Sequence, residues 1–599
     1  MKKCNWVKNK YLVSLVLNLF FLIAAFIFNE IKYEVSDDFV METILSGAYA
    51  DNINPHMLFV NVLYGYVLKP MYFLFPGINW YTISLLIWGF IACIGFAILL
   101  CNSLDYSVAI FFDFLFLVTF SNDLYILIQF TKTAAMCCIV GSLLVMHGLF
   151  RRSKEETAGL KIIANKTELV IGFVLCVIGS WIRMYAIYLI AIFVLIIIIY
   201  EYVYYIKNFF KDKESRKILM KKTLIGIGIV GVIFGCYGIN KASYKINADY
   251  KYYSEYTKVR AAIVDSADNG YEEYATDLQN IGITENDYYM LRSWNFSDPE
   301  YFTIEKLQEI SNIIAKHNHK KKQSWQNIYD QYQWRKYASY PICMACIILF
   351  VVCILWNTKN WKWYVMPWCG TAALLVYFFI RGRVLYRLEY GIFAGTFMVL
   401  IYLCLNNLKR PPENKNATIA MLLIAMCGMI MHIPTYVPDS RYTDVEIEGR
   451  KWYIDDTYND SGNYDVRKYR KVVNKADLSD GLIVEMRKHP ENVYLLDFNT
   501  TIQSLYYDWS AFESLGRGYY KNFCYLSGVT MNFPDVNQFL KKMGIVNPIK
   551  DLVKKEVYLI DTVNSEIIVT YLREHYYPNV DIEWVKNIEG YDIWKLSEN

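Results

Sequence analysis

The sequence lacks the cysteine pattern of a disulfide-stabilised secreted domain. Thirteen of its 14 cysteines lie in apolar segments or at their ends, and only Cys524 falls in a polar region. A lone cysteine there leaves no intramolecular disulfide, and the others are expected to be small packing residues. No His/Cys group has metal-ligand spacing at a plausible site. The pair Cys343-x-x-Cys346 lies within an apolar run, so we interpret it as packing.

Signals for binding nucleic acids or nucleotides are also missing. The net charge is only +4 over 599 residues, and no basic stripe interleaved with aromatic residues occurs outside the flanks of the apolar segments. No glycine-rich phosphate loop accompanies the strand-like segments near the C-terminus. We therefore expect no nucleic-acid partner and no nucleotide site.

Apolar and aromatic residues dominate instead. Hydrophobic residues make up 55% of the chain and aromatic residues 17%. Apolar runs of about 18 residues or more, long enough to cross a ~30 Å hydrocarbon core, recur along it. The sequence therefore predicts a polytopic α-helical membrane protein with about eleven transmembrane helices. The predicted spans are 11–28, 80–100, 107–120, 124–149, two within 169–206, 223–239, 339–356, 363–380, 388–408 and 417–433.

Basic residues predict how these spans are oriented. Lys2, Lys3, Lys8 and Lys10 precede the first apolar run, which has no signal-peptidase site after it, so we expect a retained first span and a cytoplasmic N-terminus. Basic clusters at 151–166 and 207–222 also indicate cytoplasmic loops. The first outer loop, 29–79, then lies on the extracytoplasmic side, with 56–75 as an interfacial helix.

The same pattern divides the chain into four parts. Residues 1–239 form an N-terminal transmembrane module, and a polar, tyrosine-rich extracytoplasmic insert of mostly helical character occupies 240–336. Residues 337–434 return to the membrane, and 435–599 form an extracytoplasmic α/β domain. That domain is expected to contain buried strands at 492–497 and 556–561 and a closing hairpin of 582–585 with 591–596.

An acidic pair follows the first span. Carboxylates at the outer end of a span must be desolvated or held in a watery cleft, and both arrangements indicate a functional site. Asp37 and Asp38 are therefore candidates for a catalytic base, with His56 as a nearby substrate-binding candidate. The structural alternative is that Ser36 or Asp37 caps a helix that runs on from Phe39.

Arginines at the outer surface form a second candidate group. Arg381, Arg383 and Arg387 lie in a short outer loop between two spans, and Arg183 falls at the break within 169–206. Guanidinium groups match phosphate oxygens in two-point fashion, so these arginines could hold a lipid phosphate. The alternative is pairing with outer acids such as Glu389 and snorkelling to headgroups.

Together, the acidic and basic groups suit sugar transfer from a phosphate-linked lipid. A carboxylate would deprotonate the acceptor hydroxyl while arginines neutralise the leaving phosphate. The cytoplasmic N-terminus, the acidic first outer loop, the interfacial helix and the terminal outer domain resemble those of GT-C-fold glycosyltransferases. That resemblance implies a polyprenyl-phosphate-linked sugar donor, a cell-envelope acceptor and a catalytic acid at Asp37 or Asp38. It implies no certain cofactor and leaves a divalent cation open.

Two other classes stay open. A transporter or flippase for lipid-linked saccharides would need charged residues at mid-membrane, of which Asp113 is the clear case, although a helix-packing hydrogen bond is its simpler role. A polysaccharide polymerase or assembly partner would use the C-terminal domain for docking.

Within the span at 223–239, Gly231 and Gly235 predict close approach of another helix.

Overall fold

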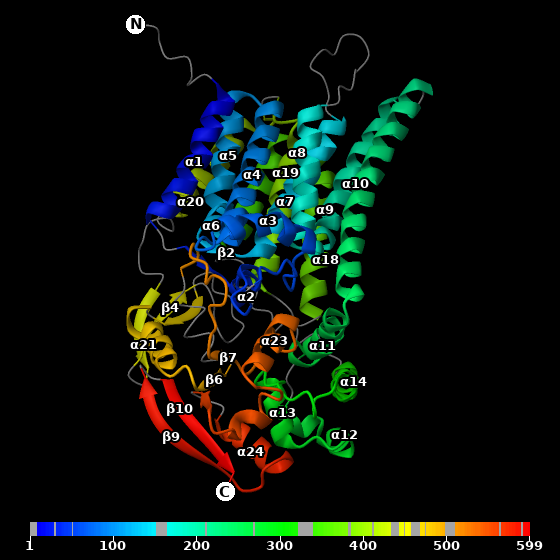
Figure 1. Cartoon of the computed structure of the whole chain (residues 1–599). Coiled ribbons are helices and arrows are strands. Elements are labelled where there is room, and N and C mark those ends of the chain that lie inside the picture. Colours follow the sequence, from blue (N-terminus) through cyan, green and yellow to red (C-terminus); the bar gives the residue numbers. More distant parts are fainter. Residues whose placement is uncertain are drawn as a thin grey trace.

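The structure is a computed structural model. It describes residues 9–28, 31–50, 52–150, 165–209, 213–266, 270–320, 340–380, 385–409, 412–432, 442–447, 450–456, 468–473, 475–497, 510–561, 565–588 and 591–598. Long helices pack side by side at one end of the molecule, and short helices and sheets form the other end (Figure 1).

Seven helices in the described part of the chain are long and apolar enough to cross a membrane. They are α1 (Lys10–Phe28), α4 (Trp80–Ser103), α7 (Phe130–Phe150), α9 (Met184–Phe209), α10 (Lys213–Ile246), α18 (Trp361–Ile380) and α19 (Tyr386–Cys404). The bundle also contains the shorter α5 (Tyr106–Phe120), α8 (Lys166–Ile182), α17 (Pro341–Trp356) and α20 (Lys415–His432), with η3 (Thr358–Asn360) before α18 (Figure 1). The structure is that of a helical membrane protein. Every predicted span overlaps one of these helices, and the full count of eleven crossings stays a prediction.

The closest helix packing in the bundle is between α7 and α8. A Cβ atom at Gly172 would lie 2.7 Å from the carbonyl oxygen of Gly141, so the two backbones touch where these glycines face each other. The prediction that Gly231 and Gly235 mediate close packing is wrong. Nothing in the described part of the chain lies within 4 Å of a Cβ at either position on α10.

Several local features of the bundle agree with the sequence. The double crossing at 169–206 breaks at Arg183, which separates the end of α8 from the start of α9. Asp113 on α5 accepts hydrogen bonds of 3.3 and 3.4 Å from the Asn18 side chain on α1, which is the predicted packing role. The segment 124–149 differs at its start, because α6 (Asn122–Tyr125) and β2 (Leu127–Ile128) precede the long helix.

The first outer loop contains β1 (Lys32–Tyr33), α2 (Ser36–Ser46) and α3 (Val62–Leu74). These elements lie at the end of the bundle that faces the C-terminal part (Figure 1). The side chain of Asn61 accepts a 3.0 Å hydrogen bond from the Leu63 amide and so caps α3. The interfacial position of this helix stays a prediction.

The insert is helical where the structure describes it. Its elements are α11 (Ala248–Val264), η2 (Tyr271–Glu273), α12 (Ala275–Asn280), α13 (Glu285–Arg292) and α14 (Ile304–Lys320). Asp298 lies in the turn before α14 and accepts hydrogen bonds from the hydroxyls of Tyr571 (2.8 Å) and Tyr576 (2.6 Å). This buried carboxylate therefore joins the insert to the C-terminal domain.

The C-terminal part contains two sheets. The first is antiparallel and consists of β3 (Tyr442–Ile447), β4 (Arg450–Asp456) and β5 (Lys468–Val473). The second has five strands in the order β7-β6-β8-β10-β9, with β7, β6 and β8 parallel and β10 and β9 antiparallel. Its elements are α21 (Lys475–Lys488), β6 (Val493–Leu496), β7 (Phe523–Tyr525), α23 (Pro534–Lys542), η6 (Lys550–Val553), β8 (Val557–Ile560), α24 (Ser565–His575), β9 (Val580–Ile588) and β10 (Tyr591–Glu598). The two predicted buried strands and the closing hairpin are confirmed as β6, β8 and β9–β10.

Candidate functional site

A short parallel bridge positions the acidic segment of the first outer loop. β1 pairs with β2, and the Glu34 amide donates a 2.9 Å hydrogen bond to the Ile128 carbonyl. α2 begins two residues later at Ser36. The acidic pair is thus held at the start of a helix, next to the loop that leads into α7.

Asp38 lies in the protein interior. Its side chain is fully buried, and one carboxylate oxygen accepts hydrogen bonds from the Tyr81 hydroxyl (2.9 Å) and the Phe130 amide (3.1 Å). Phe130 is the first residue of α7, so Asp38 satisfies a free amide at the positive end of that helix. Burial, and then the neighbouring Asp37, raise the pKa of Asp38.

The predicted capping alternative is wrong. The N-cap of α2 is Val35, and neither Ser36 nor Asp37 makes a capping hydrogen bond to this helix. The capping role in this segment belongs to Asp38, which acts on the distant helix α7.

Asp37 instead lines a cavity of about 780 Å³. Its side chain is half-buried and makes no hydrogen bond or ion pair with any residue that the structure describes. Of the two aspartates, Asp37 lines the cavity and Asp38 does not. A carboxylate that borders solvent-accessible space without an internal partner can act on a bound ligand.

Cations from distant segments line the same cavity. Arg183 comes from the α8–α9 junction and Arg387 from the start of α19, while the insert side adds Lys241, Lys245 and Arg260. The acids in the lining are Asp37 and Asp265, so these five cations and two acids leave a formal charge of +3. Among the described residues, the cavity is therefore electropositive and suited to an anionic ligand.

Arg183 is oriented by aromatic rings. Its guanidinium carbon lies 4.8 Å from the ring centroid of Phe130, 5.3 Å from that of Phe59 and 5.4 Å from that of Tyr185. Such cation–π contacts hold the planar group in one orientation. Arg381 and Arg383 lie outside the described residues, so the predicted arginine triplet is represented by Arg387 alone.

A buried ion-pair network holds the start of α19 against the first loop. The Lys132 ammonium group on α7 lies 2.5 Å from Glu34 and 2.8 Å from Asp123, and the Tyr386 hydroxyl donates to Asp123 at 2.9 Å. Lys132 is fully buried, so both carboxylates serve to neutralise it. This network places Arg387, the residue after Tyr386, at the cavity.

His56 does not line the cavity. Its ring stacks on Tyr250 at 4.2 Å and meets Tyr244 edge-on at 5.2 Å, and Nδ1 lies 3.2 Å from the Asn54 side-chain oxygen. Burial lowers the pKa of His56 to about 4, so the ring is neutral near pH 7. The structure places this predicted substrate-binding residue in an aromatic stack that joins the first loop to the insert.

The C-terminal domain closes the cavity from outside the bundle. A loop formed by residues 525–530 contributes Tyr525, Ser527 and Gly528 to the lining. This region is fixed to the first loop by hydrogen bonds from the Gly518 amide to the Gly47 carbonyl (3.0 Å) and from the Tyr520 amide to the Ala48 carbonyl (3.2 Å). The sequence analysis did not predict that the insert and this loop line the cavity. The only local signal was the basic pair Lys241 and Lys245, which lies one helical turn apart among tyrosines.

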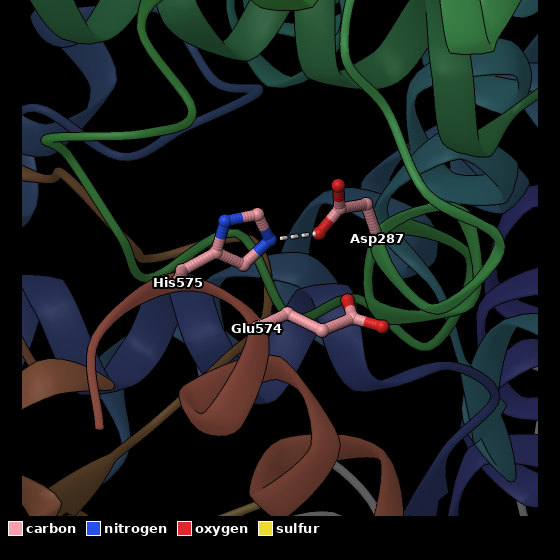
Figure 2. A group of neighbouring side chains, drawn as sticks. All are labelled: Asp287, Glu574 and His575. Atoms are coloured by element: carbon pink, nitrogen blue, oxygen red, sulfur yellow. Dashed lines mark hydrogen bonds and ion pairs between the residues drawn. The ribbon is translucent and has the colours of Figure 1, made fainter. Parts of the chain in front are cut away.

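A separate group of metal-type ligands joins α13 of the insert to α24 of the C-terminal domain (Figure 2). The ligand atoms of Asp287, Glu574 and His575 lie within 4.8 Å of one another. His575 Nε2 is 2.7 Å from one Asp287 oxygen, the Tyr301 hydroxyl and the Thr284 amide donate to the other, and the Thr284 hydroxyl donates to Glu574. Because these carboxylates already have protein partners, the group serves as a polar joint between α13 and α24.

Two comparisons bear on whether similarity assigns a chemistry to the cavity. No protein-family model matches the sequence, and no curated protein shows significant similarity to it.

Proposed function

We propose that the chain is an integral membrane glycosyltransferase of GT-C type. It would move a sugar from a polyprenyl-phosphate donor to a cell-envelope acceptor on the extracytoplasmic face. The observation that carries the proposal is the shared cavity, which Asp37 and the cations Arg183 and Arg387 line together. A general base and a phosphate-binding pair that line one cavity are what such a transfer needs.

Asp37 is the better candidate for the base. It borders the cavity and has no competing internal partner among the described residues, whereas Asp38 is committed to Tyr81 and to the N-terminus of α7. Asp37 would take the proton of the acceptor hydroxyl as its oxygen bonds to the anomeric carbon. The bond between that carbon and the phosphate oxygen breaks, and the phosphate leaves with the electron pair. A single displacement of this kind inverts the anomeric configuration.

Arg183 and Arg387 are placed to neutralise the leaving phosphate. Both lie at the ends of bundle helices, next to the first outer loop, where the headgroup of a membrane-anchored lipid would sit. A guanidinium offers two parallel hydrogen bonds to phosphate oxygens, which strengthen as charge develops on the leaving group. Eleven crossings, a cytoplasmic N-terminus and an extracytoplasmic C-terminal domain complete the proposed arrangement.

The test substitutes Asp37, the aspartate that lines the cavity. Asp37→Asn should abolish transfer from a polyprenyl-phosphate sugar while the protein still inserts and melts at the wild-type temperature. The readout is mass spectrometry of envelope glycans from cells carrying each variant, with purified protein in nanodiscs as the control for folding. Full activity of Asp37→Asn would overturn the assignment of the base. Movement of a labelled lipid-linked sugar between leaflets without transfer would favour a flippase instead.

A further inference from the structure

The insert side of the cavity contains a buried cation, Arg260, that has no counter-ion among the residues that the structure describes. Arg260 on α11 is only 3% exposed, lines the cavity, and makes no ion pair with any described residue. Its Nε atom is buried and has no hydrogen-bond partner in the described part of the chain. The guanidinium carbon lies 5.0 Å from the ring centroid of Trp294, which also lines the cavity.

A buried guanidinium without an anion is energetically costly. Arginine keeps its proton in proteins, so it cannot relieve the cost by becoming neutral. Ser527 lines the same cavity and is only 2% exposed, and its hydroxyl also lacks a partner among the described residues. The insert and the C-terminal domain thus each contribute one buried side chain to the cavity lining, and each side chain has a hydrogen-bonding atom without a partner among the described residues.

The backbone at Trp294 is strained. Its φ angle is 67°, in the left-handed region that bulky residues rarely adopt. The Trp294 amide donates to the Leu291 carbonyl at 3.1 Å, and the Gly528 amide donates to the Trp294 carbonyl at 3.4 Å. Such strain persists where the surroundings impose it and tends to occur at ligand sites. Here it holds the indole ring beside the guanidinium of Arg260.

We infer that Arg260, Trp294 and Ser527 form an acceptor subsite for a saccharide that carries a phosphate or carboxylate group. The inference rests on the proposed function, because it divides one cavity between a lipid-linked donor and its acceptor. Arg183 and Arg387 belong to the ends of bundle helices, whereas α11 lies beyond the bundle, among the helices of the insert (Figure 1). An acceptor that enters from the aqueous side would bind Arg260, and the donor phosphate would bind Arg183 and Arg387.

The test measures ligand binding by the full chain in nanodiscs. Glucuronate and glucose 6-phosphate serve as anionic acceptor probes, glucose as the neutral control, and farnesyl phosphate as the donor probe. The wild type should bind both anionic sugars more tightly than glucose. Arg260→Gln should weaken that binding at least tenfold and leave farnesyl phosphate unaffected, while Arg387→Gln should do the reverse.

The other possible outcomes show whether the acceptor subsite fails and whether the transferase proposal fails with it. Equal binding of glucose and the anionic sugars overturns the subsite. Loss of farnesyl phosphate binding in Arg260→Gln assigns Arg260 to the donor, which overturns the subsite and leaves the transferase proposal intact. A second variant covers the case in which Arg260→Gln does not fold. Arg260→Lys keeps the positive charge but lacks the paired N–H donors of the guanidinium, so it should weaken binding of the anionic sugars several-fold. Unchanged binding in that variant would also overturn the inference.

Discussion

We predict that the buried carboxyl of Glu42 makes the docking of the C-terminal domain dependent on pH. Glu42 lies on α2 with its side chain fully buried, and it accepts a 2.6 Å hydrogen bond from the Ser514 hydroxyl. Burial raises the pKa of Glu42 from 4.5 to about 8, and the bond from Ser514 opposes part of that rise. The protonated carboxyl of Glu42 is therefore favoured when the C-terminal domain is docked on α2.

The sign and size of the effect follow from linkage. A carboxyl with a raised pKa binds its proton more tightly in the docked state, so stability falls as pH rises. The stabilisation is complete below pH 4.5 and is lost by about pH 8. At about 1.4 kcal/mol per pH unit, the span from 4.5 to about 8 corresponds to at most about 5 kcal/mol.

The substitution Glu42→Gln should abolish this pH dependence. Glutamine stays neutral at every pH and keeps an oxygen for the Ser514 hydroxyl. The assay is hydrogen exchange of the Gly518 and Tyr520 amides, which bond to the first loop, corrected for the intrinsic pH dependence of exchange. In the wild type, protection should fall between pH 5 and 8, whereas in the variant it should stay constant.

A matched control uses a neighbouring exposed carboxylate. Glu513 lies at the surface, one residue from Ser514, so Glu513→Gln makes the same chemical substitution at a carboxylate that is not buried. This variant should keep the wild-type pH dependence. If Glu42→Gln loses protection with pH as steeply as the wild type, the reasoning from burial is refuted.

Three further predictions concern packing, charge and titration. Gly172→Val should lower the free energy of unfolding by about 1–3 kcal/mol because of its clash with α7, whereas Gly231→Val should change it little; thermal unfolding in detergent compares them. Lys132→Met should cost about 3–5 kcal/mol because two carboxylates lose their buried counter-ion, and a similar melting temperature would contradict this. His56→Phe should leave the pH profile of transfer unchanged above pH 5, since the ring is already neutral there.

Much of the fold follows from the sequence because hydropathy is a local property. Apolar runs of membrane-spanning length predicted helices that the structure contains, and short apolar runs bounded by turn residues predicted β6 and β8. The polar break at Arg183 likewise marked the boundary between two helices. Small residues were less informative, since Gly231 has the spacing of a packing motif but faces no helix in the described residues. Spacing alone does not say which face of a helix meets a neighbour.

The site depended on tertiary structure. The sequence by itself indicated that an acidic pair follows the first span and that arginines lie at later breaks between spans. It did not distinguish Asp37 from Asp38, because adjacent residues differ only in the direction of their side chains. The packing of α7 decided this, since its first amide binds Asp38 and leaves Asp37 at the cavity. Arg260 joined the site only because the insert folds back onto the first loop and the C-terminal domain, a long-range contact that no local pattern records.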